Sequence, residues 1–315
     1  MPCYHPMKAF RPLSDLDGGR LVFNSKKALN PHHPVTVPCG NCIGCRIDRS
    51  REWAIRCSHE ASMSSTSCFL TLTYSDEYLP HDYSVHVRTW QLFMKRLRKS
   101  LRSNKIRFFA CGEYGDETLR PHYHALIFNY SPTDKIFYKK TNSDDNLYTS
   151  PSLSKIWSYG QVYIGDVTYK SSAYVARYIM KKINGDNAVN HYTRFHPKGH
   201  IVTVEPEFCV QSRRPGIGYS WFQKYKTDAF PSDFLVVDGR PHPVPKFYLK
   251  LLKQEEAVAD ETKPYFKALN AVPSAKVVRA RIINSLSRAT DNTRERLAVR
   301  EEVKKQKLKT LKRSL

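Results

Sequence analysis

The strongest constraint on the fold is a pair of apolar, β-prone runs joined by a glycine-bounded segment. The first run is IRFFAC (106–111), the second is HYHALIF (122–128), and GEYGDETLRP lies between them. Two such runs separated by turn residues are typical of an antiparallel hairpin. The sequence therefore predicts a β-hairpin with a long turn, and this hairpin fixes which side chains can meet.

Two histidines stand one residue apart at the head of the second run. Strand side chains alternate faces with period two, so His122 and His124 share a face. The hairpin brings Glu113, at the end of the partner strand, close to His122. Two imidazoles and one carboxylate suit a divalent cation that polarises a phosphate. Polar residues on a sheet face are the alternative for the histidines, and Asp116 and Glu117 compete with Glu113 from the same turn.

Further patterns place strands and helices around this hairpin. CFLTLTY (68–74) and GQVYIGDV (160–167) read as strands, and the run after 245 turns helical and charged. The predicted helices cover 46–63, 87–102, a short segment from Ser150-Pro151, and a segment that starts at Thr168 or Ser171 and ends at Gly185. This order favours an α+β fold, in which helices pack against an antiparallel sheet.

Two tyrosines stand four residues apart in AYVARYIMKK. On a helix Tyr174 and Tyr178 project from one face, and Arg177 and Lys181 each follow a tyrosine by three residues. A phenol is a poor nucleophile at its free pKa of about 10. Nearby cations favour the phenolate and can hold the phosphate that it attacks. The alternative is that both rings pack as core aromatics.

Four cysteines near the N-terminus form a second candidate metal site. Cys39, Cys42 and Cys45 in PCGNCIGC have the spacing of zinc ligands, with Cys3 as the fourth and Cys57 as its rival. Iron–sulfur proteins also use such runs, but their proline-terminated fourth position is absent here. Reactive or buried thiols are the alternative. A structural zinc ion would stabilise an N-terminal segment that is too irregular to hold itself.

The chain is strongly basic, with 51 Lys and Arg against 29 Asp and Glu, a net charge of +22 and a pI of about 9.7. Such an excess predicts a polyanionic partner, most often nucleic acid, and the 19 Tyr and 15 Phe residues can stack on bases. The basic face of helix 87–102, the tail 294–313 and the pair Arg213 and Arg214 in SRRPGIG are candidate DNA contacts.

The sequence indicates a cytosolic, reducing location. No apolar run approaches the roughly 20 residues that a membrane helix needs, so no membrane partner is expected. The N-terminal MPCYHPMKAF also has no apolar region of the signal-peptide kind.

Three motifs together resemble a known family. FLTLT (69–73), RPHYHALIF (120–128) and YVARYIMKK (174–182), in this order and spacing, are similar to the motifs of the HUH endonucleases, which are rolling-circle replication initiators and relaxases. With PCGNCIGCR, GEYGDETLRPHYH and SRRPGIG, the chain resembles the replication initiators of microviruses, of the gokushovirus type. The motifs span residues 1–220, roughly two thirds of the chain.

The resemblance implies an HUH nuclease fold with the histidine strand central and the tyrosine helix nearby. His122 and His124 would bind Mg²⁺ or Mn²⁺, with Glu113 as the third ligand. Tyr174 and Tyr178, assisted by Arg177 and Lys181, would in turn attack single-stranded or supercoiled origin DNA. Each attack would give a 5′-phosphotyrosine link and a free 3′-OH.

The setting that the resemblance implies is the cytoplasm of a bacterial host. The resemblance implies host helicase and DNA polymerase as partners. The sequence has no G-x-x-x-x-G-K-[ST] motif, so no fused helicase is expected. The expected organisation is a Cys-rich segment (1–60), an endonuclease domain (61–225) and a basic, largely helical extension (226–315). The alternatives are a plasmid relaxase or transposase with the same chemistry, and a non-catalytic zinc-dependent DNA-binding protein.

Overall fold

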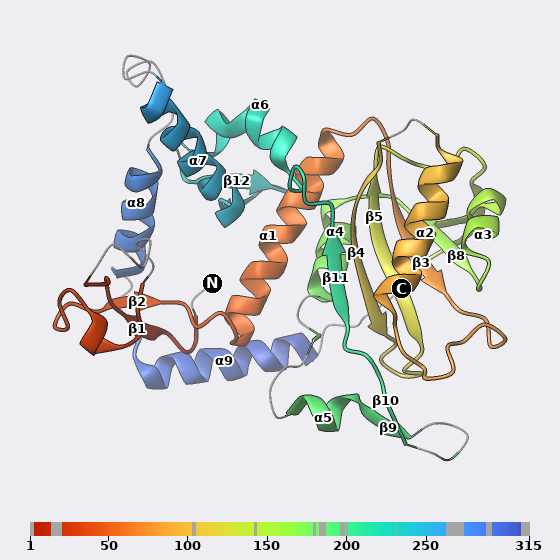
Figure 1. The fold of residues 1–315 in the computed structure, drawn as a ribbon, viewed down its shortest axis with the longest axis horizontal. Helices are drawn as coiled ribbons and strands as arrows, with labels where there is room; N and C mark the ends of the chain where they lie inside the picture. The colour runs from red at the N-terminus through yellow and green to blue at the C-terminus, as the bar shows by residue number, and fades with distance from the viewer. Residues whose placement is uncertain are drawn as a thin grey trace. The chain divides into compact units, whose positions relative to one another are not determined.

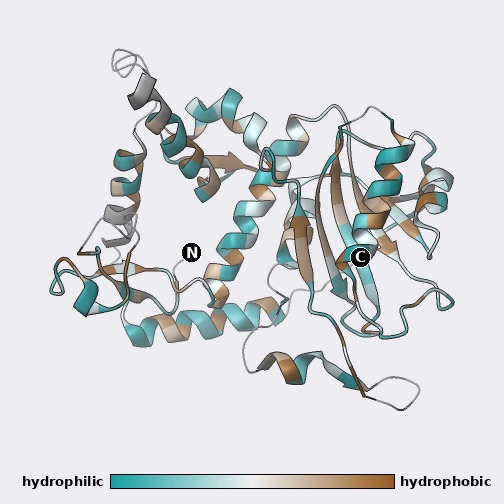
Figure 2. Ribbon diagram, in the orientation of Figure 1, coloured by the Kyte–Doolittle hydropathy of each residue, from teal (hydrophilic) through white to brown (hydrophobic). Residues whose placement is uncertain are grey.

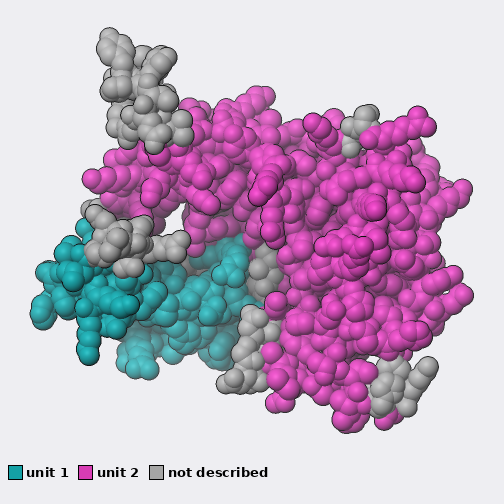
Figure 3. Space-filling model, in the orientation of Figure 1, with its two compact units in different colours: residues 1–49, 285–313 teal, residues 50–284, 314–315 magenta. Residues whose placement is uncertain are grey.

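A computed structural model describes residues 3–13, 21–102, 105–141, 144–178, 181–182, 187–195, 199, 201–230, 232–262, 274–287 and 292–309. Its contacts divide the chain into two units, shown in Figure 3. Unit 1 joins residues 1–49 to residues 285–313, and unit 2 centres on residues 50–284. The domain boundaries at 60/61 and 225/226 stay predictions.

Unit 2 is built on a seven-stranded sheet in the order β11-β4-β5-β3-β8-β7-β6, in which every neighbouring pair is antiparallel. The strands are β3 (Ser67–Thr73), β4 (Arg107–Tyr114), β5 (Pro121–Phe128), β6 (Ile136–Lys140), β7 (Asn146–Thr149), β8 (Val162–Gly165) and β11 (Phe208–Gln211). The predicted antiparallel sheet and the β4–β5 hairpin are confirmed. Because β5 pairs with β4 on one side and β3 on the other, the histidine strand lies inside the sheet.

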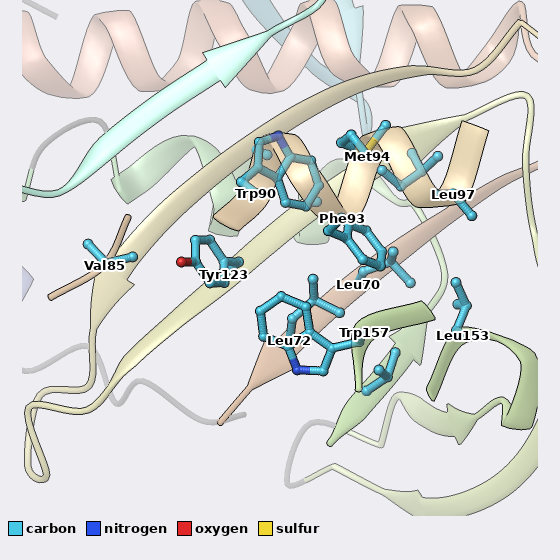
Figure 4. Close-up of a cluster of buried hydrophobic side chains, with 14 of the residues drawn as sticks. Leu70, Leu72, Val85, Trp90, Phe93, Met94, Leu97, Tyr123, Leu153 and Trp157 are labelled. Carbon is cyan, nitrogen blue, oxygen red and sulfur yellow. The ribbon is translucent and has the colours of Figure 1, made fainter. Parts of the chain in front are cut away.

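One face of the sheet is covered by α2 (Val87–Ser100) and α3 (Pro151–Trp157) (Figure 1). The apolar stripe of α2 packs on β3, β5 and α3, as Figure 4 shows, and it comprises Trp90, Phe93, Met94 and Leu97. Side chains of β5 alternate as expected: Tyr123, Ala125 and Ile127 point into this core. Figure 2 shows hydrophobic residues along these strands and both hydrophobic and hydrophilic residues along α2.

The opposite face carries α4 (Tyr169–Arg177) and the unit 2 part of α1 (Ile43–Ser62). Val175 of α4 and Cys57 of α1 pack there with Leu126 and Phe128 of β5. Thr168 caps α4, and its side chain and that of Ser171 form a reciprocal capping box. The helix is shorter than predicted, since it ends at Arg177; the predicted end at Gly185 lies outside the described residues.

The polar segment 129–149 forms β6 and β7, which the sequence did not predict. Every residue of β6 is exposed, so the alternation of apolar and polar residues that marks a half-buried strand is missing there. The rest of unit 2 contains α5 (Asn187–Tyr192), β9 (Thr193–Phe195), β10 (Ile201–Thr203), α6 (Tyr219–Ala229), β12 (Phe234–Val237), β13 (Arg240–Pro243), α7 (Lys246–Thr262) and most of α8 (Ala275–Ser287).

Unit 1 has little regular structure besides its helices. Strand β1 (Met7–Ala9) pairs with β2 (Val35–Val37), and a short 3₁₀ helix, η2 (Ser25–Lys27), lies between them in the sequence. The start of α1 and the whole of α9 (Arg294–Lys309) complete the unit. Among the described residues, no helix is long and apolar enough to cross a membrane.

Candidate metal and tyrosine site

Three neighbouring strands align the candidate metal ligands. In the β4–β5 register Glu113 lies opposite His122, as the hairpin predicted. On the other side of β5, Thr71 of β3 lies opposite His124. All four side chains point to the sheet face that α4 covers, because they occupy alternate positions of their strands.

The two histidines converge on one carboxylate oxygen. Glu113 Oε1 is 2.7 Å from His122 Nε2 and 3.2 Å from His124 Nε2. Each ring is held from its other nitrogen: His122 Nδ1 is 3.1 Å from the carbonyl oxygen of Arg120, and His124 Nδ1 is 3.0 Å from Thr71 Oγ1. Without a metal ion each Nε2 can donate a hydrogen to Glu113 Oε1. With a metal ion bound, a hydrogen on each Nδ1 would leave both Nε2 lone pairs to coordinate it.

Burial and hydrogen bonding set the charges of this cluster. Burial alone would raise the pKa of Glu113, but hydrogen bonds from His122 and His124 outweigh it and lower the pKa well below its usual value. Burial lowers the pKa of His124 to about 4. At neutral pH the cluster therefore holds an ionised carboxylate and a neutral His124 imidazole, which are the forms that bind metal ions.

Lys181 is the cation next to the cluster. Its Nζ forms an ion pair with Glu113 Oε2 and a second one, at 3.0 Å, with Asp116. It also donates to the carbonyl oxygen of Tyr114 at 3.1 Å. Asp116, which competed with Glu113 in the sequence, is thus a partner of Lys181, and the group of possible ligands contains Glu113 alone of the turn carboxylates.

Tyr174 and Tyr178 lie directly over the histidines. Their hydroxyl oxygens are 2.5 Å apart, with Tyr178 donating to Tyr174. The ring of His124 stacks on that of Tyr178 at 5.1 Å and meets that of Tyr174 edge to face at 5.3 Å. Arg177 lies 5.6 Å from the centre of the Tyr174 ring, and Lys181 lies 5.0 Å from that of Tyr178. The same face predicted from i,i+4 spacing is the face that meets the metal cluster.

Burial outweighs the nearby cations at both phenols. Arg177 lowers the pKa of Tyr174, as the sequence predicted, yet burial is the larger effect and raises the pKa of both Tyr174 and Tyr178 above the usual value. The charge of Glu113 raises both pKa values further. Burial wins because both rings are packed between α4 and the sheet, where the charged form loses its hydration.

The described residues contain two groups of side chains that could hold a metal ion. One is Glu113, His122 and His124; its mixed oxygen and nitrogen donors fit a divalent cation with positions left for substrate oxygens. The other is Cys3, Cys39, Cys42 and Cys45, whose donor atoms lie within 4.8 Å of one another. Cys57, the rival fourth thiol, is instead buried in the core beneath α1 and α4.

The predicted basic surfaces are exposed. On α2, Lys95, Arg98 and Lys99 are exposed, opposite the apolar stripe. Arg213 and Arg214 are exposed in the turn after β11, and α9 is described as far as Lys309. The sequence reading missed Thr71, because the hydroxyl that holds His124 comes from a third strand whose register no local pattern reveals.

The chain is similar to replication-associated proteins of phages. A family model described as "Replication-associated protein ORF2/G2P" matches residues 67–183, the range that holds the Glu-His-His cluster and both tyrosines. Replication-associated protein VP4 of Bdellovibrio phage phiMH2K is 35% identical over 79% of this chain and 76% of its own length.

Two further phage proteins are similar. Replication-associated protein ORF2 of Spiroplasma virus 4 is 31% identical over 81% of each chain. Replication-associated protein ORF4 of Chlamydia phage 1 is 26% identical over 69% of this chain and 54% of its own length. No solved structure matches the chain.

Proposed function

Since the chain belongs to the replication-associated protein ORF2/G2P family, we propose that it is a site-specific single-strand DNA nickase and strand-transferase that starts and ends rolling-circle replication of a circular phage genome. The observation that carries this proposal is the contact between a Glu-His-His cluster and two hydrogen-bonded tyrosines. The cluster suits a divalent cation, and the pair offers two equivalent nucleophiles at one place.

Glu113, His122 and His124 would hold Mg²⁺ or Mn²⁺. When bound, such an ion supplies positive charge that polarises a phosphodiester. Imidazole nitrogen is softer than the oxygen ligands that Mg²⁺ prefers, so we expect Mn²⁺ to bind more tightly than Mg²⁺. Lys181, which pairs with Glu113 in the chain without metal or DNA, would exchange this partner for the phosphate when both bind.

The tyrosines would perform two transfers. In the first, one phenol oxygen bonds to phosphorus and gives up its proton, the P–O3′ bond breaks, and O3′ takes up a proton. The products are a 5′-phosphotyrosine and a 3′-OH that primes synthesis. In the second, the other tyrosine cleaves the regenerated origin in the same way, and the freed 3′-OH displaces the first tyrosine, which closes the circle.

The raised pKa values of both phenols require a proton acceptor when the DNA is bound. The hydrogen bond from Tyr178 to Tyr174 leaves the Tyr174 proton directed elsewhere, so Tyr174 can lose it without breaking that bond. Arg177 and Lys181, which face the two rings, would hold the phosphate under attack.

The sheet face of the cluster extends away from α4 and offers a path for the DNA strand. Thr71 lies opposite Tyr163 of β8, and the ring of Tyr163 meets that of Tyr138 on β6 at 5.4 Å. Tyr138 is 51% exposed, and Lys139 lies 5.7 Å from its ring centre. Aromatic rings beside a cation are a stacking platform for unpaired bases.

The experiment that tests the nickase uses a supercoiled circle with the cognate replication origin. The purified chain, with Mn²⁺ or Mg²⁺, should give a nicked circle whose 5′ end stays bound to protein after denaturation. Tyr174→Phe with Tyr178→Phe, and His122→Ala with His124→Ala, should each abolish the adduct, while the two single tyrosine variants show which phenol attacks first. Tyr169→Phe, in the same helix, is the matched control.

Two outcomes would reject this function. An adduct that persists without both tyrosines would exclude them as nucleophiles. The absence of any adduct on DNA that the chain binds would favour the non-catalytic DNA-binding alternative, to which the cysteine cluster and the basic surfaces would then belong. Origin-dependent action in extracts of the bacterial host, together with host helicase and polymerase, separates a phage initiator from a plasmid relaxase or a transposase.

A further inference from the structure

We propose that Cys3, Cys39, Cys42 and Cys45 bind one structural Zn²⁺ ion, and that this ion holds the N-terminal segment and helix α9 together as unit 1. The proposal does not depend on nicking activity, because every group that it uses lies outside the Glu-His-His and tyrosine site. It begins from the placement of four sulfur atoms that come from two separate stretches of sequence.

The sulfur positions match a tetrahedral zinc site. With Zn–S distances of about 2.3 Å, the edge of a regular tetrahedron is about 3.8 Å. The sulfur atoms of Cys3 and Cys42 are 3.8 Å apart, and all four donor atoms lie within 4.8 Å of one another. Disulfide-bonded sulfurs would be about 2.05 Å apart, so this is the spacing of four separate thiols around a shared centre.

Backbone donors are already directed at the sulfurs. The N–H of Cys39 donates to Cys3 Sγ at 3.2 Å, and that of Cys42 donates to Cys39 Sγ at 3.3 Å. The N–H of Tyr4 donates to Cys42 Sγ, also at 3.3 Å. Four thiolates around Zn²⁺ carry a net charge of 2−, and N–H groups that point at the sulfurs stabilise that charge.

Helix α9 rests on this cluster through two side chains. Leu297 and Glu301, one turn apart, are the buried residues described for α9. Leu297 is 3% exposed and packs with Tyr4 and Cys42. Glu301 Oε2 is hydrogen-bonded to His5 Nε2 at 2.7 Å, and His5 follows Cys3 by two residues. Its other described side chains are exposed or only partly buried, so the cysteine segment provides the buried surface on which the helix docks.

The apolar core of this unit is too small to provide that shape. Tyr4, Cys42 and Leu297 are the buried members of the cluster, and Ala9, Phe10 and Ala28 are the other buried apolar residues described for the unit. Strands β1 and β2 have three residues each. Small domains with so little core are usually held by metals or disulfides. A zinc ion would close the loop between Cys3 and Cys39 and fix the start of α1, giving α9 its docking surface.

The test measures metal content and helix docking on the full chain. Protein expressed with ZnCl₂ should contain one zinc per chain by elemental mass spectrometry, and Co²⁺ should replace it with the absorption bands of tetrahedral thiolate coordination. The double variant Cys39→Ser, Cys42→Ser should lose the metal. Cys209→Ser, which removes a half-exposed thiol of unit 2, should keep it.

Docking of α9 is read by limited trypsin digestion with mass spectrometry of the cut sites. Cleavage after Arg300, next to buried Glu301, should be at least tenfold faster when zinc is absent, whether by chelation of the wild type or by the double variant. Zinc added back to the chelated wild type should restore protection, which separates metal loss from misfolding of the variant. Three results would overturn the proposal. They are iron bound in place of zinc, zinc retained by the double variant, and a rate of cleavage after Arg300 that is the same with and without zinc.

Discussion

At the residue scale, the site depends on groups that fix the imidazoles as much as on the imidazoles themselves. His124 is fully buried, and its Nδ1 is held by Thr71 from the neighbouring strand. Residues that orient a ligand commonly change metal affinity by one or two orders of magnitude. The hydroxyl of Thr71 is therefore expected to matter although it touches neither metal nor DNA.

Thr71→Val should weaken Mn²⁺ binding by roughly 10- to 100-fold while leaving the fold intact, because valine keeps the shape and removes the acceptor for His124 Nδ1–H. Isothermal titration with Mn²⁺ measures the change. Thr73→Val is the control, since Thr73 lies opposite His122 but bonds to the carbonyl oxygen of Gln161. Equal weakening in both variants would contradict the role given to Thr71.

His59 predicts acid sensitivity of the fold. It stacks on Trp221 at 3.7 Å and hydrogen-bonds to Tyr248 at 2.8 Å, and burial lowers its pKa from 6.5 to about 3. Between pH 6.5 and 3, His59 is protonated in the unfolded chain and neutral in the folded chain. Stability is thus complete above pH 6.5 and falls as the pH drops, by roughly 1.4 kcal/mol per pH unit from this group.

Urea unfolding of wild type and His59→Gln at a series of pH values measures this contribution. The variant should be less stable at neutral pH, and the gap should narrow as the pH falls towards 4. His81→Gln, which replaces an exposed histidine of the same unit, is the control. A gap that stays constant with pH would show that His59 contributes packing alone.

At the element scale, two aromatic neighbours of β6 lie on opposite faces of the sheet, at a point where the pairing with β7 shifts register. Phe137 pairs with Tyr148, which pairs with Ile164 of the core beneath α2. Tyr138 reaches Tyr163 instead, on the face of the metal cluster. The two rings are similarly exposed, at 56% and 51%, yet they belong to opposite faces of the sheet.

Tyr138→Ala should weaken binding of a single-stranded oligonucleotide by about 1–3 kcal/mol, because one base loses its stacking partner. Fluorescence anisotropy with a labelled oligonucleotide measures it. Phe137→Ala removes an equally exposed ring from the other face and should have little effect. Loss of affinity in the Phe137 variant alone would place the DNA strand on the α2 side of the sheet.

At the scale of the whole molecule, the net charge of +22 makes affinity for DNA dependent on salt. Five cations line a hollow of about 500 Å³ between α7 and α8. The sequence indicated no candidate DNA contact in these two helices. The five cations are Lys246, Lys250, Lys253, Lys276 and Arg279. Their spacing around one hollow favours contacts to successive phosphates.

Lys250→Gln should lower the slope of log affinity against log salt by about one, since one fewer counterion is released. Titrations of single-stranded DNA at several salt concentrations measure the slope. Lys155→Gln, an exposed lysine of α3 on the face away from the metal cluster, is the control. An unchanged slope for Lys250→Gln would remove α7 from the DNA interface.

The sequence by itself determined the parts of this protein that depend on local periodicity. The period of two residues in a strand placed His122 and His124 on one face of the sheet. The i,i+4 spacing placed Tyr174 of α4 and Tyr178, the residue that caps this helix, on the same side. The β4–β5 hairpin, the apolar stripe of α2 and the spacing of three cysteines were equally readable, because each involves residues close together in the chain.

Only the tertiary structure decided the contacts that join distant segments. It placed Cys3, rather than Cys57, beside the other three cysteines, and it brought Thr71 to His124. It also buried both tyrosines so deeply that their pKa values are raised, although cations lie beside both rings. The physical reason is common to all three. Register between non-consecutive strands and the depth of burial depend on how the whole chain packs, and no local pattern of residues encodes either.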